Sequence, residues 1–145
     1  MEPTVIIAEG SIDILILRRS LERLYPYLSD YITFFDYEGA KPDDGASYVV
    51  KFLRAFAAAR IATSILAVFD NDAAGLEACT TAEGLDLPDN INVTMLPDIE
   101  IARSYPTLGP QGMHKIDVNG TAVSVDACNH RGSCSQTERF PARII

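Results

Sequence analysis

Four short apolar runs, separated by segments with a helical period, constrain the fold of this chain more than any other feature. The runs lie at about residues 4–8, 31–36, 64–69 and 91–96. Runs of this length are typical of strands that are buried on both faces, as in parallel sheets covered by helices. The sequence therefore predicts a βαβαβαβ order. We expect an α/β fold whose mainly parallel central sheet of about four strands is flanked by helices.

The segments between the runs have the pattern of amphipathic helices. In the first segment, apolar residues recur at spacings of three and four, at Ile14, Leu17, Leu21 and Leu24. We expect Ser11 to cap this helix and Pro26 to end it, because proline cannot continue the hydrogen-bond ladder. Further helices are expected at residues 49–59 and 72–83.

The pattern changes after Pro97. Residues 98–105 favour a short helix, and the following prolines and glycines are expected to interrupt regular structure, at Pro106, Gly109, Pro110 and Gly112. Residues 128–145 have no apolar period and contain several turn-forming residues. We therefore expect one domain over residues 1–126 and an irregular tail over residues 127–145.

Acidic side chains follow two of the apolar runs. Glu9 and Asp13 follow the first run, and Asp70 and Asp72 follow the third. Ligands of open α/β folds bind at the carboxyl ends of parallel strands, so these carboxylates are expected to share one crevice. Crowded carboxylates repel one another unless cations that prefer oxygen ligands lie among them. The small Gly75 would let the next helix start close to this site.

Each motif alone has a simpler interpretation. An Asp-x-Asp after a strand also forms a turn with a helix cap, and Asp13 alone suits the first turn of a helix. A calcium-binding loop is excluded, because Ala74 stands where the third oxygen ligand is required and Thr81 stands where a bidentate Glu is required. A haloacid-dehalogenase-like phosphotransferase remains an alternative, with Asp70 as nucleophile. In that class the motif normally follows the first strand, whereas here it follows the third.

Together the two motifs resemble those of a Toprim domain, the catalytic module of bacterial primases, type IA and type II topoisomerases and OLD-family nucleases. Residues 5–13 resemble the strand-Glu-Gly motif of the family, and residues 66–75 resemble its Asp-x-Asp motif. The resemblance covers roughly residues 4–126. The Asp that stands four residues after Glu9 is similar to the pattern of OLD-like and HEPN-associated Toprim proteins of bacterial defence systems.

The resemblance implies a Rossmann-like Toprim fold and metal-dependent hydrolysis of DNA or RNA phosphodiesters, in bacterial defence or repair. It implies catalytic roles for Glu9, Asp70 and Asp72, with the counterpart of Glu9 acting as a general acid or base. The implied ligands of Mg²⁺ or Mn²⁺ are Glu9, Asp13, Asp70, Asp72 and Asp126. An alternative is a non-catalytic Toprim module that binds metal or protein and lacks its partner domain or partner protein.

Charge bears on the choice between these functions. The formal net charge of −8 counts against non-specific adhesion to nucleic acid, which normally depends on clustered Lys and Arg. The basic residues nevertheless group on two expected helices, with Arg18, Arg19 and Arg23 on one and Lys51, Arg54 and Arg60 on the other. A local positive strip therefore remains compatible with the sequence.

Other residues give weaker signals. Asp36 and Asp98 also follow apolar runs and are held as candidates for the periphery of the same crevice. Cys128, His130 and Cys134 do not match a closed zinc site, because a fourth ligand is not evident. The odd number of cysteines, without a signal peptide or a membrane-spanning run, predicts a cytoplasmic protein with no membrane contact.

Overall fold

The computed structural model describes residues 3–35, 45–110, 112–123 and 142–143. Its elements are β1 (Thr4–Ile7), α1 (Ser11–Leu24), η1 (Pro26–Leu28), β2 (Ile32–Phe34), α3 (Ala46–Ala58), β3 (Ser64–Phe69), β4 (Asn71–Asp72), α4 (Ala73–Glu83), β5 (Ile91–Met95), η2 (Glu100–Ser104), β6 (Tyr105–Gly109), β7 (Gly112–Ile116), β8 (Ala122–Val123) and β9 (Ala142–Arg143). No helix in these ranges has the length and apolar character needed to cross a membrane.

The central sheet has four parallel strands in the order β2-β1-β3-β5. The expected α/β fold, with a parallel sheet flanked by helices, is therefore confirmed. The chain runs from β1 through α1 to β2 on one side, and from β3 through α4 to β5 on the other. The direction of winding thus reverses between β1 and β3. In open α/β sheets this is the position where ligands bind, beyond the carboxyl ends of the strands.

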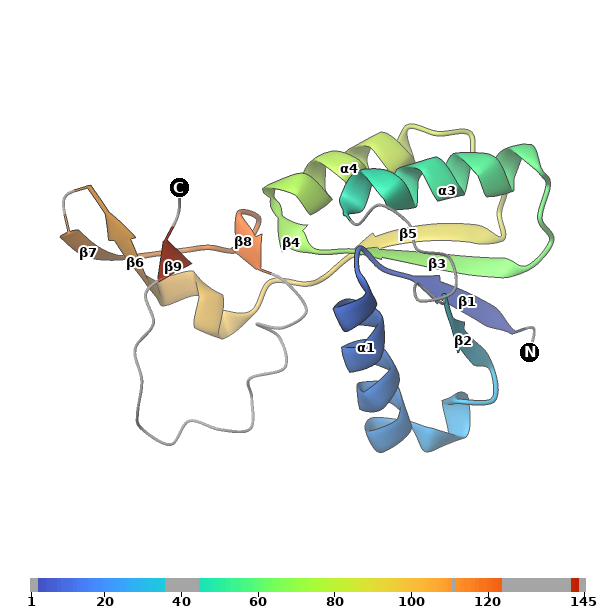
Figure 1. The fold of residues 1–145 in the computed structure, drawn as a ribbon, viewed down its shortest axis with the longest axis horizontal. Coiled ribbons are helices and arrows are strands. Elements are labelled where there is room, and N and C mark those ends of the chain that lie inside the picture. Colours follow the sequence, from blue (N-terminus) through green and yellow to red (C-terminus); the bar gives the residue numbers. More distant parts are fainter. Residues whose placement is uncertain (1–2, 36–44, 111, 124–141, 144–145) are drawn as a thin grey trace.

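Two apolar clusters hold the helices on opposite faces of the sheet (Figure 1). Helices α3 and α4 cover the face that carries Ile7 and Phe69, both fully buried. Helix α1 covers the other face, where Ile14 packs with Ala8 and Phe34. Successive side chains of a strand point to opposite faces, so Ile7 and Ala8 serve different clusters. Burial of a side chain as large as Phe69 stabilises the fold by about 1.5–3 kcal/mol.

The two ends of α1 were both predicted from the sequence, and one of the predictions is wrong. The expectation that Ser11 caps α1 is wrong, because Gly10 is the N-cap and makes no side-chain cap bond. Gly10 has the extended backbone that a cap position requires, so Ser11 becomes the first helical residue. The other end of α1 is as expected: the helix ends at Leu24, and Pro26 starts the short helix η1.

The region after β5 departs from the expected interruption of regular structure. Strands β6 and β7 form an antiparallel hairpin in which Gly109 pairs with Gly112. Gly112 has a φ of 104°, a left-handed conformation that favours glycine, so these two glycines pair at the end of a hairpin instead of ending regular structure. Strand β9, which belongs to the range expected as a tail, pairs in parallel with β6.

Candidate functional site

The two acidic motifs lie at the carboxyl ends of neighbouring strands. Glu9 stands two residues after the end of β1, and Asp70 follows β3 directly. The Oε1 atom of Glu9 accepts a hydrogen bond from the backbone N–H of Asp70, with a donor–acceptor distance of 2.9 Å. Residues 9 and 70 are therefore in direct contact where the winding of the sheet reverses.

Gly75 packs the first turn of α4 against both motifs. A Cβ atom added at this buried glycine would lie 2.2 Å from the carbonyl oxygen of Asp70 and 2.9 Å from Oε1 of Glu9. The first of these contacts is with backbone, which cannot turn aside as a flexible side chain can. Glycine is therefore required for the close approach of α4, as expected from the sequence.

Asp72 is the N-cap of α4. Its backbone is extended, and its Oδ1 atom accepts a hydrogen bond of 2.7 Å from the N–H of Gly75. This bond satisfies one of the amides that a helix start leaves without an intrahelical partner. The simpler interpretation of the Asp-x-Asp motif, a turn with a helix cap, is therefore realised at Asp72.

The side chain of Asp13 lies close to Gly10, the residue that follows Glu9. Asp13 is the third residue of α1, within the first turn, where the positive end of the helix dipole favours a carboxylate. A Cβ atom added at Gly10 would lie 3.2 Å from Oδ2 of Asp13. The carboxylate of Asp13 is thus close to the backbone that immediately follows Glu9.

The pKa of Glu9 is affected by the other carboxylates of the two motifs. Burial raises the pKa of Glu9 above its ordinary value of 4.5, while the hydrogen bond from the Asp70 amide lowers it. The negative charges of Asp72 and Asp13 each raise this pKa further. The charged form of Glu9 is therefore destabilised by its acidic neighbours. A bound divalent cation would reverse this effect, because opposite charge favours ionised carboxylates.

The carboxylate oxygens of this site are suitable ligands for a hard cation. Their side chains, however, are not arranged as a coordination shell. In the part of the chain that the structure describes, no group of three or more His, Cys, Asp or Glu side chains is arranged to hold a metal ion. One oxygen each of Glu9 and Asp72 is bonded to a backbone amide. Carboxylate oxygens are the ligands that Mg²⁺ prefers. Binding would require these side chains to turn toward a common point.

Asn71 is a site residue that the sequence reasoning missed. The residue is 1% exposed, and its side-chain amide nitrogen donates a hydrogen bond of 2.9 Å to Oδ1 of Asp98. Its side-chain oxygen accepts a bond of 2.8 Å from the N–H of Gly120. Through Asn71, the Asp-x-Asp motif is therefore bonded to Asp98, which was a candidate for the periphery of the crevice. In the sequence, the one signal for Asn71 was its position between Asp70 and Asp72. This signal did not predict burial, because an asparagine in a turn motif is usually exposed.

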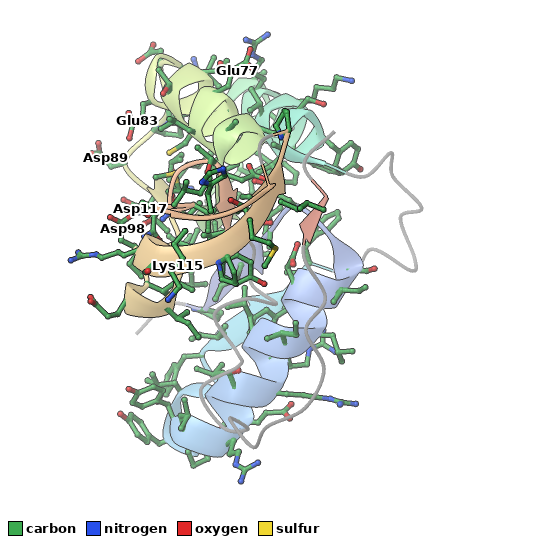
Figure 2. All side chains as sticks on the ribbon, turned by 90° about the vertical axis from the view of Figure 1, so that its left-hand side faces the viewer. Glu77, Glu83, Asp89, Asp98, Lys115 and Asp117 are labelled. Carbon is green, nitrogen blue, oxygen red and sulfur yellow. The ribbon has the colours of Figure 1, made fainter. Side chains whose placement is uncertain are left out.

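A second asparagine extends this network on the side of the molecule that Figure 2 presents, where Asp98 and Asp117 lie near each other. The side chain of Asn119 donates to Oδ1 of Asp117 at 2.8 Å and accepts from the N–H of Ile99 at 2.9 Å. The pairing of β4 with β8 adds backbone bonds. The segments before η2 and before β8 are therefore fixed against the edge of the sheet that carries the acidic motifs.

Several residues predicted from the sequence lie outside the described ranges. These are Asp126, proposed as a metal ligand, Asp36, held as a candidate for the periphery, and the weak zinc candidates Cys128, His130 and Cys134. Of the other predicted ligands, the structure places Glu9 in contact with the backbone of Asp70 and within electrostatic reach of Asp13 and Asp72. It leaves Asp126 a prediction.

Comparison with known proteins found no match. The chain matched no family model, no curated protein and no solved structure. The function is therefore inferred from the geometry of this site and the chemistry of its residues.

Proposed function

We propose that this chain hydrolyses nucleic-acid phosphodiester bonds with the help of divalent cations, in the manner of the Toprim nucleases that its motifs resemble. The observation that carries the proposal is the bond between Glu9 and the amide of Asp70, which joins the two acidic motifs at the reversal point of the sheet. The effect of Asp72 and Asp13 on the pKa of Glu9 supports it, because it indicates that the carboxylates act on one another.

The proposed ligands of Mg²⁺ or Mn²⁺ are Glu9, Asp13, Asp70 and Asp72, with Asp126 as the further ligand implied by the resemblance. When bound, such cations activate a water and neutralise charge on the leaving oxygen of a phosphodiester. We assign Glu9 as the residue that takes or gives a proton in this reaction, which is the role that the Toprim resemblance implies for it.

A second candidate function is a Toprim-like module that binds metal or a partner protein without cleaving nucleic acid. The cap bond between Asp72 and Gly75 favours this candidate, because it gives Asp72 a structural role that needs no substrate. The haloacid-dehalogenase-like alternative has less support. A nucleophilic Asp70 would not require Glu9, whereas Glu9 contacts the Asp70 backbone directly.

The test is cleavage of supercoiled plasmid DNA and of a labelled RNA by the wild type and by Asp70→Asn, with Mg²⁺, with Mn²⁺ and with EDTA. We expect metal-dependent cleavage by the wild type and a loss on the order of a hundredfold in the variant. Asp86→Asn, which removes an exposed carboxylate after α4, is the control and should cleave like the wild type.

Three results would overturn the nuclease proposal. Equal cleavage by the wild type and Asp70→Asn would assign the activity to something other than this site. Cleavage of a phosphomonoester in place of either polymer would favour the phosphotransferase. Tight Mn²⁺ binding without cleavage of either polymer would favour the non-catalytic module.

A further inference from the structure

Helices α3 and α4 lie side by side on one face of the sheet (Figure 1). Residues of both helices line a groove. Its volume is about 460 Å³. Small buried residues form its floor, with Ala46 and Val50 from α3 and Ala78 from α4. Because these side chains are short, the larger residues on either side stand above them as walls.

The two walls of the groove differ in charge. Lys51 and Arg54 line it from α3, and both are exposed. Neither makes an ion pair within the described ranges. Among the described residues that line the groove, the acidic one is Glu77 of α4, which is labelled in Figure 2. Two cations face one carboxylate in this described lining, which is therefore locally positive on a chain whose net charge is −8.

The groove begins next to the acidic motifs. Ala74 lines it and stands two residues after Asp72. On the other side it is lined by Ala46, whose preceding residue, Gly45, donates its N–H to the carbonyl oxygen of Glu9 at 3.1 Å. A helix rises 1.5 Å per residue, so Arg54 lies about 12 Å along α3 from Ala46. The positive wall therefore leads away from the edge that carries Glu9 and Asp72.

We propose that this groove binds the phosphodiester backbone of a single-stranded nucleic acid, beside the nucleotide that the acidic site would cleave. Lys51 and Arg54 would contact successive phosphates, while Glu77 repels phosphate and restricts the backbone to the α3 side. The groove, with its volume of about 460 Å³, offers space for a phosphodiester chain beside the two cations. The inference rests on the proposed function for the position of the scissile phosphate, but the binding itself requires no metal.

The test is fluorescence anisotropy of a short fluorescein-labelled single-stranded DNA, and of an RNA of the same sequence, titrated with protein in EDTA over a range of salt concentrations. We expect the double variant Lys51→Gln/Arg54→Gln to bind about tenfold more weakly than the wild type. The slope of log K against log salt should become shallower by about 1.4, because two phosphate contacts are lost. Glu77→Gln should bind about two- to threefold more tightly.

The control is Arg19→Gln/Arg23→Gln, which removes the same charge from exposed positions on α1, across the sheet from the groove. Near-wild-type binding by this control supports the groove. The groove proposal would be overturned if both double variants bound the nucleic acid equally weakly, or if the wild type showed no measurable binding. Binding through Lys51 and Arg54 without cleavage would overturn only the proposed function. Wild-type binding and cleavage by Lys51→Gln/Arg54→Gln would overturn only the groove.

Discussion

Glu9 in the first acidic motif and Asp72 in the second each accept one backbone amide, but across very different lengths of chain. Asp72 accepts from Gly75, three residues later, and so starts α4. Glu9 accepts from Asp70, 61 residues later, and so joins β1 to β3. The first contact is a local helix cap, whereas the second depends on the order of strands in the sheet. The candidate site therefore needs both a local signal and the whole fold.

The largest effect should come from Gly75, which contacts both motifs. Gly75→Ala would place a Cβ atom 2.2 Å from the Asp70 carbonyl and 2.9 Å from the Glu9 carboxylate. The first turn of α4 must then move, and we expect the free energy of unfolding to fall by about 3 kcal/mol. Urea denaturation measures this as a lower midpoint.

Gly84, at the other end of α4, provides a matched control. A Cβ atom there would come no nearer than 3.5 Å to any neighbour, and the backbone is helical. Gly84→Ala should therefore leave the urea midpoint near that of the wild type. If Gly75→Ala were as stable as Gly84→Ala, the close approach of α4 to the two motifs would be wrong.

Asp72 should show an effect of intermediate size that separates its two roles. Asp72→Ala removes the cap and should lower the free energy of unfolding by about 1 kcal/mol. Asp72→Asn keeps the cap, since asparagine is an equally good N-cap residue, and should preserve stability while weakening Mn²⁺ binding. Thermal unfolding with and without Mn²⁺ measures both. If Asp72→Asn gained as much stability from Mn²⁺ as the wild type, Asp72 would be a cap and not a ligand.

The smallest effect should be the pH dependence that Glu9 gives to the metal-free protein. Its folded pKa is raised, so the folded state binds more protons than the unfolded state as pH rises above about 4.5. Stability that is fully present below this pH should therefore be lost as pH rises through the folded pKa. Glu9→Gln cannot ionise and should remove this loss, so its melting temperature at neutral pH should exceed that of the wild type. Glu22→Gln, at an exposed position on α1, should keep the wild-type profile.

Much of the fold was predictable because its signals are local. Apolar runs mark β1, β2, β3 and β5, and the apolar period at Ile14, Leu17 and Leu21 marks α1. The meeting of Glu9 with Asp70 followed from the same pattern, since carboxyl ends of parallel strands share one edge. The need for Gly75 followed from the sharp passage of the chain from β3 into α4.

The remainder depended on context that the sequence does not display. Gly10 replaced Ser11 as the cap of α1, because the backbone takes the extended conformation one residue earlier. The turn residues near Gly112 indicated an interruption, but the hairpin became evident only from the pairing of β6 with β7. Asn71 is buried because β8 and Asp98 close over it, and those partners are distant in sequence.

The most direct test of the account is Mn²⁺ binding by isothermal titration calorimetry to the wild type and to Glu9→Gln. The variant retains an oxygen that can accept the Asp70 amide, so the contact between strands should survive while the charge is lost. We predict one or two sites in the wild type, with affinity that falls as pH is lowered, and binding at least about tenfold weaker in Glu9→Gln. Equal affinity in the two proteins would contradict a shared metal site at these motifs.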